Sequence, residues 1–290
     1  MIVRQLIVTG DDFGLALPVN EAIEIAHRDG ILSAASLVVG GAAMADALER
    51  VRRLPRLRVG LHLVLVEGRP VLAPESVPEL VDADGEFRTD LTASGFRFFF
   101  RPRVREQIEA EIRAQFEAFR ETGLALDHVN AHNHMHLHPT VLGILLRVGR
   151  EFGLDAVRVP YEPPGASARA SGGGRLGRTV GALALAPWTG LLRSRLRRGR
   201  IKFNDFLFGL NDTGRMEEPL VLRQLDELPD GVTEMYFHAA TRRCPELDRS
   251  MPEYRCQDEL VALTSDRVRD ALVTLGIRII AFGDLPAPGR

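Results

Sequence analysis

Short apolar runs alternate with amphipathic segments along most of the 290 residues. The apolar runs are contiguous instead of alternating with polar residues, which predicts strands buried on both faces. The predicted strands are 4–10, 34–40, 58–65, 126–132, 156–160, 232–239 and 277–283. Apolar residues recur at helical spacing between them, and the predicted helices are 18–26, 42–54, 104–122, 140–153, 220–228 and 266–276. This strand–helix order, repeated near seven or eight times, predicts an α/β fold, a TIM-barrel-like (β/α) barrel of parallel strands with outer helices.

One segment interrupts this order, and it contains no acidic residue between Pro163 and Phe203. A loose Gly/Ser-rich stretch at 165–178 is followed by an apolar stretch at 180–192 and a basic stretch at 193–200. We therefore expect one barrel domain over 1–290 with an insertion at about 163–203, such as a lid. Apolar residues followed by clustered arginines suit contact of 180–200 with an anionic membrane surface. A solvated loop followed by one core helix explains the composition equally well.

Charge and cysteine content narrow the class of protein. The net charge of −2 argues against an electrostatic nucleic-acid binder. Cys244 and Cys256 are too few for a disulfide framework, and reduced thiols in a cytoplasmic enzyme are expected. The first residues lack a signal-peptide pattern, and no apolar run reaches the roughly 20 residues of a membrane span. We expect a cytoplasmic protein that is at most peripheral at the inner membrane. The sequence does not decide between a monomer and a homodimer.

Polar residues stand at the ends of the first and third predicted strands. Asp11 and Asp12 follow the first strand in "TGDDFG", where adjacent carboxylates repel unless a cation or a catalytic proton is present. A turn or helix-capping role is the alternative for these two residues. His62 lies between leucines in "VGLHLVL", where a core histidine bonded to the backbone is the simpler interpretation.

Five of the eight histidines lie in one run, "HVNAHNHMHLHP" at 128–139. Four imidazoles of this run cannot all bind one ion. If the strand ends near Ala131, His132 and then His134 are best placed at the edge of the sheet. We expect His136 and His138 to orient other groups, cap the next helix or contact substrate, as the residues that support metal ligands from behind do.

Arg158 and His238 also stand at predicted strand ends, although Arg158 could simply pair with Glu162. The carboxyl ends of barrel strands converge on one face, so these polar residues are expected to meet there. Asp, His, His and water form a suitable shell for a divalent metal, which activates a water molecule. A second Asp as general base and His238 as the acid that protonates a departing amine would suit hydrolysis of an amide or ester.

Three motifs, "VTGDDFGLA", "VGLHLVLVEGRPV" and "DHVNAHNHMHLHPTV", resemble the YdjC-like carbohydrate deacetylases in order and along most of the chain. The stretches "ASLVVGG", "FRFFF" and "RVPYEPP" resemble the branch associated with hopanoid biosynthesis, which removes acetyl from an N-acetylglucosaminyl hopanoid. The resemblance implies a TIM-barrel-like fold and a divalent metal, usually Mg²⁺, with Zn²⁺ in related deacetylases.

Residue by residue, the resemblance implies Asp12, His62 and His132 as metal ligands and Asp11 as the base. His238 matches a late family histidine, which is usually followed by Pro-Gly but here by two alanines. The remaining residues of the set, His134, His136 and Arg158, are expected to contact substrate or support the ligands.

The expected activity is metal-dependent removal of the N-acetyl group from an N-acetylglucosamine-type sugar, with a glycosylated hopanoid as the expected substrate. Three alternatives remain: a chitooligosaccharide-type deacetylase, a related metal phosphoesterase, and a lipid- or sugar-binding protein without turnover.

Overall fold

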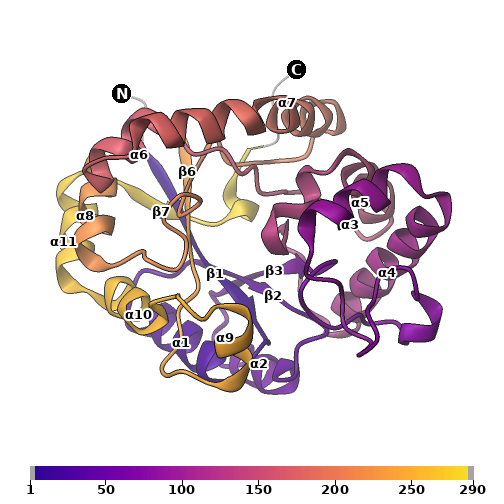
Figure 1. Cartoon of the computed structure of the whole chain (residues 1–290). Coiled ribbons are helices and arrows are strands. Elements are labelled where there is room, and N and C mark those ends of the chain that lie inside the picture. The colour runs from indigo at the N-terminus through magenta and orange to yellow at the C-terminus, as the bar shows by residue number, and fades with distance from the viewer. Residues whose placement is uncertain (1–3, 287–290) are drawn as a thin grey trace.

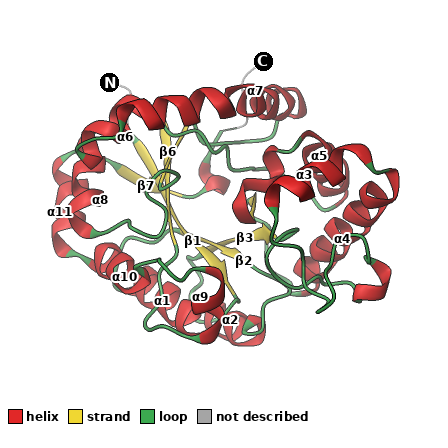
Figure 2. Ribbon diagram, viewed as in Figure 1, coloured by secondary structure: helices red, strands yellow, loops and turns green. Residues whose placement is uncertain are grey.

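The computed structural model describes residues 4–286. Its central strands are enclosed by helices (Figures 1 and 2). The strands are β1 (Gln5–Phe13), β2 (Ala34–Leu37), β3 (Arg58–Leu63), β4 (Val129–Ala131), β5 (Phe206–Phe208), β6 (Val232–Phe237) and β7 (Arg278–Ile280). The α-helices are α1 (Leu17–Arg28), α2 (Met44–Val51), α3 (Leu91–Phe100), α4 (Pro102–Glu121), α5 (Pro139–Glu151), α6 (Pro164–Ser171), α7 (Arg175–Gly199), α8 (Glu218–Asp226), α9 (Pro245–Ser250), α10 (Cys256–Thr264) and α11 (Asp266–Thr274). Short 3-10 turns are η1 (Pro74–Ser76), η2 (His132–Leu137) and η3 (Phe282–Asp284).

Six strands form a parallel sheet in the order β4-β3-β2-β1-β6-β5, which curls into a half-barrel. β6 pairs with one edge of β1. On the other edge, β7 pairs with the first residues of β1 and β2 pairs with its last residues. Single parallel bridges, Val129 to Val157 and Ala156 to Lys202, span the open side between β4 and β5. The expected parallel (β/α)-barrel class is therefore confirmed.

The core explains why these segments form these elements. All residues of β1 after Gln5 are buried, as the contiguous apolar run predicts. On α4 the buried stripe includes Val104, Ile108, Ile112 and Phe116, which recur at helical spacing and pack toward the strands. Because parallel strands point the same way, the carboxyl ends of β1, β3, β4 and β6 meet on one side of the sheet.

Three local expectations were wrong. β1 continues to Phe13, so Asp11 and Asp12 lie inside the strand and not after it. The segment 156–160 forms bridges but no regular strand. The stretch at 165–178 is not a loose loop, because α6 occupies its first half and α7 begins at Arg175 after a turn through left-handed Gly172 and Gly174.

The segment between the bridges at Ala156 and Lys202 thus consists of two helices. α7 crosses the top of the molecule in Figure 1, and it contacts α5 and η2. Thr189, Leu192 and Leu196 are the buried residues of this helix, so its amino-terminal half stays on the surface. Across residues 4–286, no helix has the length and apolar character needed to cross a bilayer.

Candidate metal centre

An irregularity in β1 turns both aspartates toward the centre of the barrel. In a regular strand, adjacent side chains point to opposite faces. Here the register with β2 shifts between Gly10 and Phe13, and Asp12 has a left-handed backbone with φ of 62°. Such a conformation is uncommon at a residue other than glycine, although aspartate adopts it more readily than most, and strained backbone of this kind clusters at functional sites. The irregularity lets Asp11 and Asp12 serve one pocket.

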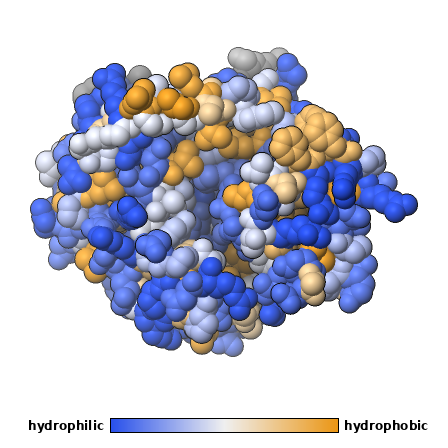
Figure 3. Space-filling view, in the orientation of Figure 1, coloured by the Kyte–Doolittle hydropathy of each residue, from blue (hydrophilic) through white to orange (hydrophobic). Residues whose placement is uncertain are grey.

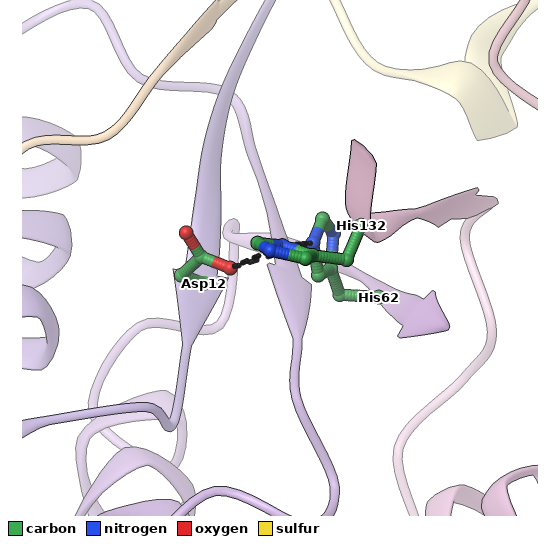
Figure 4. Close-up of side chains that lie close together, drawn as sticks. All are labelled: Asp12, His62 and His132. Carbon is green, nitrogen blue, oxygen red and sulfur yellow. Dashed lines mark hydrogen bonds and ion pairs between the residues drawn. The ribbon is translucent and has the colours of Figure 1, made fainter. Parts of the chain in front are cut away.

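Asp12, His62 and His132 bring three potential metal ligands together (Figure 4). His62 Nε2 lies 3.4 Å from Asp12 Oδ1, and His132 Nδ1 lies 3.7 Å from the same oxygen. The two ring nitrogens are 3.4 Å apart. The side chains come from β1, β3 and the start of η2, and one ligand atom of each lies within 4.8 Å of the others.

Both histidines are oriented through the nitrogen that faces away from this cluster. His62 Nδ1 lies 2.8 Å from Asn130 Oδ1, an acceptor that places the proton on Nδ1 and leaves Nε2 free to bind a cation. His132 Nε2 lies 3.5 Å from Glu67 Oε2, and Asn133 holds that carboxylate with a 2.8 Å hydrogen bond. Carboxylate or amide partners behind metal-bound histidines are a regular feature of metal sites.

The electrostatics of the cluster favour a cation. Burial opposes ionisation of Asp12, yet His132 and His62 lower the pKa of its carboxyl to about 2. Burial likewise opposes a charged His132, but Asp12 and Glu67 raise its pKa to about 10. Asp12 Oδ2 is buried and has no hydrogen-bond partner. An oxygen without a partner, two imidazole nitrogens and surplus negative charge fit a divalent metal such as Zn²⁺ or Mg²⁺.

Asp11 does not join the three ligands but forms a buried ion pair with Arg158. Two hydrogen bonds of 2.6 and 2.9 Å link the guanidinium to both oxygens of Asp11, and Ser36 and Asn130 donate to Oδ1. Although burial alone raises the pKa of Asp11, Arg158 holds it far below its usual range. Arg158 also donates to Glu234 on β6.

The alternative ion pair of Arg158 with Glu162 is therefore not formed. Glu162 accepts hydrogen bonds from Ser167 and from the backbone of Asn211 instead, and it lies 3.5 Å from Arg178 of α7. Arg158 is fully buried, so its two carboxylate partners are the groups that balance its charge.

His238 follows β6 and approaches the cluster from the other side of Asp12. Its Nε2 lies 3.9 Å from Asp12 Oδ2, the oxygen that has no hydrogen-bond partner. The rings of Tyr236 and Tyr254 flank the imidazole edge-on, and the backbone N–H of His238 donates to Glu259. His238 is thus held beside the ligands without belonging to the tight group of three.

The histidine run separates into different roles because the chain turns after β4. Asn133 and His134 adopt left-handed conformations with φ of 49° and 53°, so the imidazoles do not line one side. His134 lies edge-on to Tyr236, and burial keeps its pKa well below the usual value. His136 Nε2 lies 2.9 Å from the backbone oxygen of Arg158.

The two outer histidines of the run are structural. His138 caps α5 by accepting a hydrogen bond from the backbone of Thr140, as expected for a residue before the next helix. His128 is buried, stacks on Phe282 and pairs with Asp127.

Four polar residues of this region were not predicted from the sequence: Ser36, Glu67, Asn130 and Glu234. Glu234 had a recognisable signal, an acidic residue inside the apolar strand "VTEMYF", and Asn130 had a similar one between Val129 and Ala131. Ser36 and Glu67 lie in segments where a serine or a glutamate is ordinary, so no local signal marks them.

The parallel barrel and the Asp/His/His cluster at the carboxyl ends of its strands place this protein among β/α barrels that have a candidate metal site at that end. The sequence profile of the YdjC-like protein family matches residues 5–274, and the chain belongs to this family.

Two relatives named carbohydrate deacetylase are similar to part of this chain. Over 159 residues the chain is 40% identical to a protein named carbohydrate deacetylase from Brevibacillus brevis, covering 54% of this chain and 60% of that relative. A protein of the same name from Oceanobacillus iheyensis is 35% identical over 145 residues, covering 50% and 60%. The aligned segment thus spans less than two thirds of either relative.

The crystal structure of an Enterococcus faecalis protein proposed to cleave cellobiose phosphate superimposes with a TM-score of 0.76. It is 23% identical and covers 97% of this chain and 98% of its own. This similarity shows that the barrel fold is shared.

Glu67→Gln tests the arrangement of the cluster. Because Glu67 holds His132 from behind, we expect this change to weaken Zn²⁺ or Mg²⁺ binding about 10- to 100-fold, measured by competition with a chromogenic chelator. Glu75→Gln on η1 makes the same change at an exposed glutamate and should leave the affinity unaltered. Equal metal affinity in Glu67→Gln and the unmodified protein would show that Glu67 does not orient His132.

Proposed function

We propose that this protein is a metal-dependent hydrolase that removes the N-acetyl group from an N-acetylglucosamine-type sugar. One observation carries the proposal: Asp12, His62 and His132 gather three ligand atoms directly beside Asp11 and His238. The relatives named carbohydrate deacetylase supply the substrate class.

In this proposal Asp12, His62 and His132 hold the divalent cation. The cation, when bound, lowers the pKa of a water molecule and polarises the acetyl carbonyl. Asp11 accepts the proton of that water, and His238 donates a proton to the departing amine nitrogen. His238 is positioned for this by Tyr236 and Tyr254, which flank its ring.

The strong ion pair with Arg158 shapes the role proposed for Asp11. A carboxylate held far below its usual pKa is a weak base. It can therefore accept a proton only from a water molecule whose pKa is lowered, as a bound divalent cation would do. Three of its hydrogen bonds fall on Oδ1, whereas Oδ2 accepts one from Arg158. Oδ2 thus keeps a lone pair for the proton.

We further propose that the sugar is carried by a lipid and that the natural substrate is a glycosylated hopanoid, with Mg²⁺ as the metal. The resemblance of "FRFFF" and "RVPYEPP" to the hopanoid-associated branch supports this choice. A lipid substrate requires access to a membrane from the cytoplasmic side. Residues 180–200, which form most of α7 and the arginine after it, supply it, because exposed Val180 and Leu183 precede a carboxyl-terminal half rich in arginines.

The activity is tested by measuring acetate release from N-acetylglucosamine oligomers and N-acetylglucosaminyl lipids, with and without a chelator. We expect release that stops with the chelator and returns with the metal. Asp11→Asn should lower kcat about 10²- to 10⁴-fold while metal binding is kept, because it removes the base and not a ligand.

Four results would contradict these assignments. Full acetate release by Asp11→Asn would exclude Asp11 as the base, and loss of metal affinity in that variant would mean that Asp11 acts through Ser36 and His62. Phosphate release in place of acetate release would identify a phosphoesterase. Binding of sugar without any turnover would identify a binding protein.

Membrane contact is tested by sedimentation with lipid vesicles. We expect binding to vesicles containing anionic phospholipid, and about tenfold or more weaker binding for Arg198→Ala combined with Arg200→Ala, since each basic residue near an anionic surface contributes about 1 kcal/mol. Arg52→Ala, an exposed arginine on the far side of the fold next to α2, serves as the control. Equal binding to neutral and anionic vesicles would contradict the proposed contact.

A further inference from the structure

An apolar groove of about 500 Å³ lies beside the candidate metal centre, between α3, η2 and α7. No Asp, Glu, Lys or Arg lines it. Its principal apolar residues are Phe96, Phe99, Met135, Leu137, Leu185 and Trp188. The volume falls within the range of small-molecule sites, which are mostly apolar with a few polar groups.

Aromatic side chains of the groove remain in contact with water. Phe96 is 63% exposed, and Phe99 and Trp188 are each 43% exposed. Apolar side chains gather along the upper rim of the face drawn in Figure 3, over α7 and α3. Uncovered apolar surface of this extent next to a catalytic-type site is typical of a ligand-binding groove.

The wall formed by α3 is anchored and not a loose segment. Asp90 caps the start of the helix, and Arg97 donates hydrogen bonds to the backbone and the carboxylate of Glu79. Phe98 is buried and lies edge-on to His138. The helix is therefore fixed through Arg97 and Phe98. Phe96 stacks on Phe100, and Phe99 lies edge-on to Phe100 and His138, yet Phe96 and Phe99 both keep a large exposed fraction.

The turn η2 connects the groove directly with the metal cluster. His132, its first residue, faces Asp12, whereas Met135 and Leu137 line the groove. Asn133 takes part in both the groove and the metal cluster. It lines the groove, and its side chain donates a hydrogen bond to Glu67, which lies behind His132. A molecule whose reacting end lies at Asp12 can extend into the groove by passing this single turn.

We propose that this groove is a subsite for an apolar aglycone, the group attached to the amino sugar, so that the enzyme selects amphipathic glycosides. This inference rests on the proposed N-deacetylase function. The lining favours this occupant because an anionic group would find no lysine or arginine there. The polar side chains of the lining are Thr92, Asn133, His134 and His138, so a further sugar unit would find few hydrogen-bond partners along the aromatic wall of α3.

Trp188 gives a direct signal of occupancy, because it is the single tryptophan of the chain. Its fluorescence is recorded during titration with dodecyl N-acetyl-β-glucosaminide, kept below its critical micelle concentration, and with the methyl glycoside. We expect a saturable blue shift with the dodecyl compound alone, since its chain removes the indole from water. The kcat/KM for acetate release should likewise be higher for the dodecyl than for the methyl glycoside.

Phe99→Ala should weaken dodecyl glycoside binding about tenfold or more and reduce the dodecyl-to-methyl preference in kcat/KM by a similar factor. Leu176→Ala is the matched control, because Leu176 is a 79% exposed apolar residue of α7 that does not line the groove. This control should change neither quantity.

The outcomes separate this inference from the proposed function. Acetate release from the methyl glycoside without a dodecyl-induced blue shift would overturn the subsite and leave the deacetylase function standing. A saturable blue shift without acetate release from any sugar would support the apolar site and overturn the deacetylase function. A Phe99→Ala variant that behaves like Leu176→Ala would overturn the subsite. A blue shift that appears without glycoside as the protein concentration is raised would also overturn the subsite, because a second copy of the chain would then cover the groove.

Discussion

The buried guanidinium of Arg158 is the constraint on which the rest of the site depends. It bonds both Asp11 of β1 and Glu234 of β6, two strands that pair directly with each other. Removing one partner of such a buried pair typically costs about 3–5 kcal/mol, because a charge is left without compensation. The pairing therefore holds the two strands, and the residues that follow them, in one arrangement.

The charge balance of this network also explains the metal-type cluster. Arg158 offsets only one of its two carboxylate partners, and Asp12 adds a further negative charge a residue away from Asp11. Burial lowers the pKa of His132, but the carboxylates of Asp12 and Glu67 raise it to about 10. This surplus of negative charge fits the proposed divalent cation, for which Asp12, His62 and His132 already stand close together. Asn130 couples the two parts, since it bonds both Asp11 and His62.

The same strand ends explain how much could be predicted from the sequence. Asp12, His62 and His132 were expected to meet because parallel strands converge at one edge, and the structure brings them together. The bulge in β1 could not be predicted, since it depends on the register with β2 and not on local residue preference. The partners of Arg158 were missed for a related reason: Asp11 and Glu234 are 147 and 76 residues away along the chain.

The segment around α7 shows a different limit. Glycine and serine at 165–178 suggested a loop, but only Gly172 and Gly174 take left-handed conformations, and helices form on either side of them. The absence of acidic residues was visible in the sequence. That Trp188 of α7 lines the same groove as Phe96 and Phe99 of α3 was not, because the two helices are far apart along the chain and no local pattern relates them.

The central claim is that Asp12, His62 and His132 hold one divalent cation while Asp11 stays paired with Arg158. A crystal structure of the Zn²⁺-loaded protein, with anomalous scattering to locate the metal, tests it most directly. The account predicts a single ion about 2.0–2.2 Å from an Asp12 oxygen, His62 Nε2 and His132 Nδ1, with the Asp11–Arg158 hydrogen bonds intact. An ion bound by Asp11 in place of Asp12, or one held elsewhere in the histidine run, would contradict it.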